Sequence, residues 1–342
     1  MPRFPRVLNR LAPRRKHIAL AGVATATLAA TAAWVAQKAR RAEQNHPAQG
    51  AFLEVDGVRI HYLDRGQGTP VLLLHGNALS AEDFVVSGLI NRLAKRYRVI
   101  AFDRPGFGHS ERPRDRLWTA DAQAALLHKT FVQLGIAQPI VLGHSWGTLV
   151  ALALALREGA AVRRLILVSG YYFPTARLDV ALAAPPAVPI LGDVMRYTVS
   201  AVSARLLLGR TVKAMFAPQP VPPDFLPVLS REMLVRPAQI RANAEDAAFM
   251  IPAAAALRKR YATLAVPTAI FAGGADKVVD LDTHARQLHA ELSESELHVL
   301  PDLGHMLHHT VPDQVIAAIA SDNNAIRPDV SSDTTTLSLI QS

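Results

Sequence analysis

The chain has 342 residues, half of them hydrophobic, and a formal net charge of +9. It has no cysteine, which excludes disulfides, thiolate zinc sites and thiol catalysis. Nine of the 37 lysines and arginines but one of the 28 acidic residues lie in residues 1–49, so the body is nearly neutral. Because the body lacks a basic stripe, we expect no nucleic-acid partner. No metal-ligand or nucleotide-phosphate motif occurs in the sequence, so we expect no metal and no cofactor.

The N-terminal arm carries its positive charge around an apolar run. Residues 18–36 form an uncharged run of 19 residues, with six basic residues before it and three after it. This length just suffices for a helix that spans a membrane. The heavier charge before the run places the N-terminus inside and the body outside the inner membrane. The alternatives are a signal peptide cleaved near Ala30-Thr31-Ala32, which leaves a secreted or periplasmic protein, and a soluble extension. We expect residues 1–49 to comprise this arm, the anchor or signal segment, and a polar linker over 37–49.

Strands and helices alternate through most of the body. Residues 52–63 alternate around Asp56-Gly57 and predict a hairpin. The alternation predicts a mostly parallel central sheet flanked by helices, built from residues 50–169 and 265–321. Short apolar runs predict further strands at 71–74, 98–103, 139–143, 164–169, 267–272 and 296–300.

The first functional signal along the chain is His75-Gly76-Asn77, which ends the strand at 71–74 and opens a loop. A loop here is placed to give the backbone N–H of Asn77 to an oxyanion hole. His75 is a further candidate for substrate contact.

The strongest signal is Gly143-His144-Ser145-Trp146-Gly147, which has the form G-x-S-x-G. It follows the strand at 139–143 and precedes a run of Leu, Val and Ala that favours a helix. This context is typical of a nucleophilic serine held on a strained turn, with the helix N-terminus favouring a developing negative charge. We predict Ser145 as the nucleophile and the N–H of Trp146 as the second oxyanion donor.

Residues 170–264 break the alternation of strand and helix and are rich in Ala, Leu and Pro. We expect a helical cap whose apolar side chains line an acyl pocket, although they could serve only to pack the cap. The pocket candidates are Tyr171, Tyr172, Phe173 and Phe249. A charged substrate would need a cap residue such as Arg177, Arg196, Arg205 or Arg241, for which a solvated face is the alternative.

The last two strands each lead to a candidate catalytic residue. Asp276 lies just past the strand at 267–272, closer to it than Asp280 or Asp282, and is placed to orient a histidine. Of the 13 histidines, only His305 lies in a loop beyond a strand end, and we predict it as the general base. The competing histidines are His298, inside a strand, and His308 and His309, at the start of a helix. Residues 322–342 are polar, and we expect a disordered tail there.

Together these segments resemble the cap-bearing serine hydrolases of the α/β-hydrolase fold family. The order Ser145, Asp276, His305 matches that family, and Asp103 to Ser110 resembles its D-x-x-G-x-G-x-S loop. The resemblance covers about residues 50–320 and implies a cap inserted after the strand at 164–169. Haloalkane dehalogenases and soluble epoxide hydrolases are similar in outline but have an aspartate nucleophile where this chain has Ser145.

The function that we expect is hydrolysis of a carboxylic ester with an apolar or neutral acyl group, through an acyl-enzyme. The same triad also serves C–C bond hydrolases, aminopeptidases or amidases, and perhydrolases, so these alternatives stay open. A membrane-tethered binding protein without chemistry is an alternative of another class.

Overall fold

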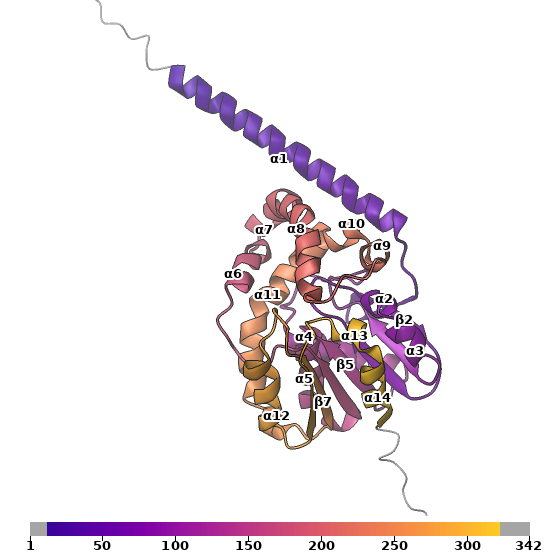
Figure 1. Ribbon diagram of the computed structural model, residues 1–342. Coiled ribbons are helices and arrows are strands. Elements are labelled where there is room, and N and C mark those ends of the chain that lie inside the picture. The colour runs from indigo at the N-terminus through magenta and orange to yellow at the C-terminus, as the bar shows by residue number, and fades with distance from the viewer. Residues whose placement is uncertain (1–11, 322–342) are drawn as a thin grey trace, which may run out of the picture.

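The computed structural model describes residues 12–321, and its body is built on one eight-stranded sheet (Figure 1). The strand order is β1-β2-β4-β3-β5-β6-β7-β8. β2 pairs antiparallel with both β1 and β4, and all other neighbours are parallel. The prediction of a mostly parallel sheet with an antiparallel start is confirmed. The strands are β1 (Ala51–Val55), β2 (Val58–Arg65), β3 (Pro70–Leu74), β4 (Arg98–Phe102), β5 (Ile140–His144), β6 (Arg164–Val168), β7 (Thr268–Gly273) and β8 (Ser295–Leu300).

The central strands are apolar along their length because helices cover both faces of the sheet. Every residue of β5, β6 and β7 is buried. In β3, Leu72 and Leu74 pack into the core on one face, whereas Val71 and Leu73 pack into the core on the other. Continuous apolar runs of this kind are typical of parallel strands.

The helices divide between the two faces. On one face lie α4 (Ala120–Gln133), α5 (Gly147–Arg157) and α12 (Gln287–Glu291). On the other face lie α2 (Asp83–Val86), α3 (Leu89–Leu93), α13 (Leu307–Thr310) and α14 (Pro312–Ala320). Three short helical turns complete the body: η1 (Gly159–Ala161), η3 (Tyr261–Thr263) and η4 (Leu281–Arg286).

The segment after β6 forms helices only, as the sequence predicts. The cap helices are α6 (Leu178–Ala183), η2 (Pro185–Ala187), α7 (Leu191–Tyr197), α8 (Val199–Phe216), α9 (Phe225–Leu229), α10 (Arg231–Leu234) and α11 (Pro237–Arg258). The longest of them, α11, continues through an internal Pro252. Its residues contact the loop that follows β3, so the cap lies over the carboxyl ends of the parallel strands.

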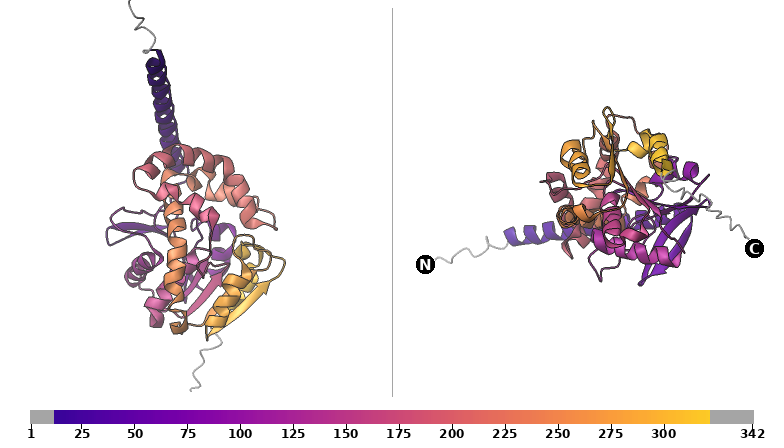
Figure 2. Two further views of the ribbon diagram at one scale, coloured as in Figure 1. Left: turned by 90° about the vertical axis from the view of Figure 1, so that its left-hand side faces the viewer. Right: turned by 90° about the horizontal axis from the view of Figure 1, so that it is seen from below.

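A long N-terminal helix, α1 (Ala12–Asn45), projects from the cap side of the molecule (Figures 1 and 2). It continues to Asn45, so the polar linker predicted from residue 37 is wrong over 37–45. The reason is that residues 37–45 contain no Gly or Pro, and Val35 and Ala42 are buried. Within the described residues, this is the one helix long and apolar enough to cross a membrane, a test that a signal sequence also passes. The predicted tail lies outside the described residues. The basic residues before the run lie outside them or have side chains that the structure does not describe.

Candidate active site

Ser145 lies on the turn between β5 and α5, partly exposed, with a backbone φ of +51°. Residues other than glycine rarely adopt this conformation. The surrounding chain holds it: the N–H of Ser145 donates to Val168 O at 2.9 Å, and Ser145 O accepts from the N–H and hydroxyl of Thr148. The serine is thus held on a strained turn at the end of a buried strand.

Gly147, the last glycine of the elbow, is required by close packing. A Cβ on Gly147 would lie 2.2 Å from the carbonyl oxygen of Leu74 in β3, so any side chain there would push the strand away. The elbow therefore lies directly against the end of β3.

The loop after β3 runs beside the serine. A Cβ built on Gly76 would lie 3.1 Å from the Cβ of Ser145. In the described part of the chain, the backbone N–H groups of Asn77 and Trp146 have no recorded acceptor. Two free donors next to a serine are what an oxyanion hole requires.

Asp276 and His305 meet because β7 and β8 are neighbours in the sheet. His305 Nδ1 lies 2.8 Å from Asp276 Oδ2, and both side chains are 3 % exposed. The other carboxylate oxygen accepts from the N–H groups of Val278 and Val279 at 2.7 and 3.1 Å. A carboxylate fixed in this way holds the proton on Nδ1, which leaves Nε2 free to accept another.

The competing acidic residues lie elsewhere. Asp280 caps the helical turn that follows it, accepting from the N–H of Thr283 at 2.8 Å. The side chain of Asp282 is 81 % exposed and pairs with Arg286. Neither carboxylate is bonded to His305.

A buried histidine cluster lies behind His305. His308 and His309 each donate from Nε2 to one oxygen of Asp83, at 2.8 and 2.7 Å. His144 packs against His308 with ring centroids 4.3 Å apart and the rings tilted by 51°, and its Nε2 lies 3.3 Å from the carbonyl oxygen of His305. Burial would raise the pKa of Asp83, but the two histidines hold it well below its usual range. Burial also lowers the pKa of His144 and of His308.

This cluster is the one group among residues 12–321 whose arrangement suits a metal ion. The ligand atoms of Asp83, His308 and His309 lie within 4.8 Å of one another. Because each Asp83 oxygen already accepts a hydrogen bond from one histidine, hydrogen bonding alone accounts for the geometry.

A buried arginine supports the loop after β3, and sequence reasoning missed it. Arg104 is fully buried, and its guanidinium donates to the carbonyl oxygens of His75 and Gly76 at 2.9 and 3.1 Å. Its charge is balanced by Asp246 at 2.6 Å, which also accepts from Arg112 at 3.0 Å. A paired and fully bonded charge of this kind fixes backbone geometry, whereas an unpaired one would be strongly destabilising.

Helix α11 carries the other half of this support. Asn243 Oδ1 accepts from the N–H of Ala78 at 2.9 Å, and Asn243 O accepts from the side-chain amide of Asn77 at 3.2 Å. The carbonyl oxygen of Asp246 accepts from the indole N–H of Trp146 at 2.9 Å. The cap thus holds both predicted oxyanion donors. The only local signal for Arg104 is its place in the 103–110 loop, and no local signal marks the α11 residues.

The predicted substrate-contact residues separate in the structure. His75 is fully buried; its Nδ1 donates to Gly76 O and its Nε2 accepts from the N–H of Arg104, so it supports the loop and does not face a substrate. Burial and Arg104 lower its pKa to about 3. Tyr171, Tyr172 and Phe173 are together but buried in the core. Phe249 lines a separate crevice against α4.

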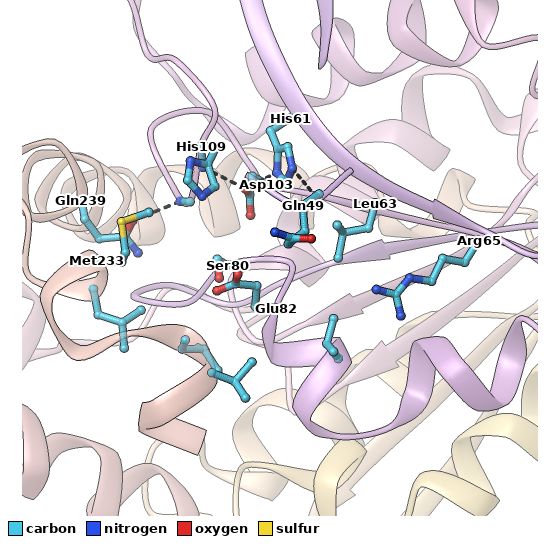
Figure 3. A pocket seen from close by; sticks show the side chains of 15 residues that line it. Gln49, His61, Leu63, Arg65, Ser80, Glu82, Asp103, His109, Met233 and Gln239 are labelled. Carbon is cyan, nitrogen blue, oxygen red and sulfur yellow. Dashed lines mark hydrogen bonds and ion pairs between the residues drawn. The ribbon is translucent and has the colours of Figure 1, made fainter. Parts of the chain in front are cut away.

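A small cavity of about 130 Å³ lies beside the segment that follows Asn77, and none of its lining residues belongs to the predicted triad (Figure 3). His61 and Asp103 form its polar wall, joined at 2.7 Å, while Leu229 and Met233 close it from the cap. Glu82 also faces this cavity, and burial together with Asp103 raises its pKa to about 7.

Comparisons with known proteins place the chain among enzymes of diverse chemistry. Haloalkane dehalogenase 2 of Mycobacterium tuberculosis is 27 % identical over 81 % of this chain and 95 % of its own length. The 2-hydroxymuconate semialdehyde hydrolase of a Pseudomonas species is 38 % identical over 40 % of this chain and 50 % of its own length.

Solved structures show the same fold. An esterase from Exiguobacterium antarcticum matches with a TM-score of 0.68 and 21 % identity, covering 80 % of this chain and all of its own. A structure described as a membrane phospholipase A, a bacterial virulence factor, matches with a TM-score of 0.64 and 20 % identity, covering 92 % of this chain and 99 % of its own. The sequence profile described as alpha/beta hydrolase fold matches residues 69–312. The chain therefore belongs to the alpha/beta hydrolase fold family.

Proposed function

We propose that the protein is a membrane-anchored serine hydrolase that cleaves carboxylic esters. The observation that carries this proposal is the 2.8 Å contact of His305 with Asp276 in loops at the same sheet edge as the strained, partly exposed Ser145. In this proposal the hydroxyl of Ser145 attacks the ester carbonyl, and His305 Nε2 takes its proton. Asp276 stabilises the imidazolium that forms.

The oxyanion is stabilised by the free N–H groups of Asn77 and Trp146. His305 then returns its proton to the leaving alcohol, and an acyl group remains on Ser145. Water, deprotonated by His305, releases the acid. Hydrolysis of this kind needs no group beyond the residues of the chain and water.

A neutral substrate is favoured over a charged one by the side chains of the cap. The cap presents many apolar side chains, and its arginines at 177, 205 and 241 are paired with acids. These features support an apolar or neutral acyl group. C–C hydrolysis, amide hydrolysis and perhydrolysis use the same triad and are the alternatives that the experiment separates.

The experiment uses the full chain in detergent micelles with a panel of p-nitrophenyl esters from acetate to laurate and a fluorophosphonate label. We expect hydrolysis and labelling in the wild type, a fall of about 10⁴-fold or more in kcat in Ser145→Ala, and no loss in the matched variant Ser203→Ala in the cap. Labelling without ester turnover would direct the search to C–C, amide or peracid substrates. Absence of both would favour a binding protein without chemistry.

A further inference from the structure

Outside the proposed catalytic site, a charged cavity of about 630 Å³ lies where α1, α7 and α11 meet. Arginines from four segments of the chain line it, and the first turn of α11 contributes Ala238. The arginines are Arg59, Arg112, Arg196, Arg236 and Arg241, and the acidic residues in the lining are Glu43 and Glu111.

Four of the five arginines pair with acids: Arg112 with Asp246 and Glu245, Arg196 with Asp193, Arg236 with Glu43, and Arg241 with Glu245. Three of these acids are each shared between two arginines, since Asp246 also pairs with Arg104, Asp193 with Arg114, and Glu245 serves both Arg112 and Arg241.

Among the described residues, no acid pairs with the guanidinium of Arg59, which stacks on Phe52 at 4.1 Å. The side chain of Arg112 is 2 % exposed, and its Nη2 has no hydrogen-bond partner; the Nε of Arg196 is likewise buried without one. Burial lowers the pKa of Arg241, and although Glu245 opposes this, neighbouring arginines add to it. Because three of the acids are each shared between two arginines and Arg59 has no acid partner among the described residues, positive charge remains in excess around the cavity.

The position of the cavity along α1 determines its depth relative to a membrane that α1 spans. Val35, near the end of the apolar run, is fully buried against Ala201 of α8 and Ile240 of α11. If the run spans a membrane, these cap helices lie at its surface. Glu43, in the cavity wall, lies two turns past the end of the run, or about 10 Å at 1.5 Å per residue. Since the headgroup layer is roughly 5–8 Å deep on each side of the hydrocarbon core, the cavity lies at the outer edge of the headgroups.

The cap also carries exposed apolar side chains, which agrees with this placement. Figure 2 shows the cap helices between the projecting α1 and the sheet. Large apolar side chains on α6 to α8 and the segment joining them are more than half exposed: Leu178, Leu182, Ile190, Leu191, Val194, Val199 and Leu206. An apolar surface of this extent is typical of a membrane contact.

We propose that the arginine-lined cavity binds the phosphate of an anionic phospholipid headgroup in the leaflet that α1 enters. Guanidinium groups form bidentate hydrogen bonds with phosphate oxygens. The N-terminus of α11, 22 residues long, adds a favourable dipole at Ala238. A lipid is favoured over a soluble phosphate because Glu43 of α1 lines the cavity and the cap carries exposed apolar side chains. The proposal requires α1 in a membrane but does not depend on the ester chemistry.

The experiment titrates the full chain in dodecyl maltoside micelles with ether-linked phosphatidylglycerol, which has no ester bond to cleave, followed by calorimetry. Ether-linked phosphatidylcholine and inorganic phosphate are the comparison ligands. We expect saturable binding of phosphatidylglycerol that phosphatidylcholine does not match. Arg59→Gln and Arg196→Gln are each expected to weaken binding about tenfold.

Arg286→Gln is the matched control, since Arg286 is exposed and pairs with Asp282 away from the cavity. Arg59 is exposed and its guanidinium has no acid partner among residues 12–321, so its replacement leaves the fold intact. Equal affinity for the two lipids would overturn the proposal. So would unchanged binding in both cavity variants, which would assign the affinity to the basic N-terminal arm. If inorganic phosphate displaced the lipid and bound with the same affinity as the lipid, the cavity would be a site for soluble phosphate.

Discussion

Replacing Asp276 tests the orientation of His305 at the proposed site without changing the nucleophile. Its carboxylate holds Nδ1 of His305 at 2.8 Å. Asp276→Asn keeps the shape but removes the charge and favours the wrong histidine tautomer, so we expect kcat to fall about 10³- to 10⁴-fold with little change in KM. The measurement is steady-state ester hydrolysis.

Asp282→Asn is the matched control for Asp276→Asn, because Asp282 is a carboxylate in the same loop region that pairs only with Arg286. It is expected to retain wild-type kcat. An equal loss in both variants, or none in Asp276→Asn, would contradict the assigned role of Asp276.

Glu82 gives the protein a pH-dependent stability that is independent of catalysis. Its pKa is raised from 4.5 to about 7, mainly by burial, so the native state holds a proton that the unfolded chain releases. The free energy of unfolding therefore falls as pH rises from about 4.5 to 7 and is level above. Glu82→Gln removes this contribution, and we expect it to stabilise the protein at pH 8 by up to about 3 kcal/mol relative to wild type.

The measurement is thermal unfolding of wild type, Glu82→Gln and the exposed control Glu54→Gln at pH 5 and pH 8. The difference between wild type and Glu82→Gln is expected at pH 8 and much smaller at pH 5. Identical pH dependence in all three proteins would mean that Glu82 has an ordinary pKa in the folded state.

At the scale of elements, α11 joins the cap through Asn243 to the loop that carries the proposed oxyanion donor Asn77. Its side-chain oxygen accepts from the N–H of Ala78, a residue with φ +62°. Asn243→Ala removes this acceptor and loosens the loop that presents Asn77. We expect kcat to fall about tenfold and stability to fall by about 1 kcal/mol.

The measurement pairs ester hydrolysis with urea unfolding, and Ala248→Ser, at an exposed position of the same helix, is the control. A large stability loss with unchanged kcat would show that α11 only packs the cap and does not position the loop.

The elements that the sequence predicted well are those whose signal is local. The apolar runs at β3, β5, β6 and β7 and the glycines at 143 and 147 carry the information for strand and elbow within a few residues. The pairing of Arg104 with Asp246 spans 142 positions of the chain, so no local pattern reveals it. The end of α1 was misjudged because polar residues 37–45 suit a linker by composition, whereas packing against the cap keeps them helical.

The predicted site residues divide in the same way, into those with a local sequence signal and those without one. The contact of Asp276 with His305 could be predicted because each residue follows a strand end, and neighbouring parallel strands bring such residues together. The substrate-contact candidates were chosen by aromatic character alone, which does not distinguish a core side chain such as Tyr172 from one that lines a pocket.

For the whole molecule, the arrangement of α1, cap and sheet relates the membrane to the proposed site. The cap lies between α1 and the sheet (Figure 2), and its exposed apolar side chains lie on α6 to α8. If α1 spans a membrane as proposed, the cap lies at the membrane surface and the proposed active site lies where amphiphilic esters concentrate. In that case α1 would raise the local concentration of such substrates without contributing to the chemistry.

Retention of α1 is the prediction that belongs to this scale. We expect the expressed chain to keep its full mass of 37.0 kDa and to resist extraction of membranes with carbonate. Ala26→Arg puts a charge near the middle of the run at a cost of about 2.5–3.5 kcal/mol and is expected to shift protein to the soluble fraction. Gln37→Arg, just past the run, is the control and should stay with the membrane. A shortened chain that begins just after Ala32 and is recovered in the soluble fraction would instead establish a cleaved signal peptide. The cap would then have no tether to the membrane.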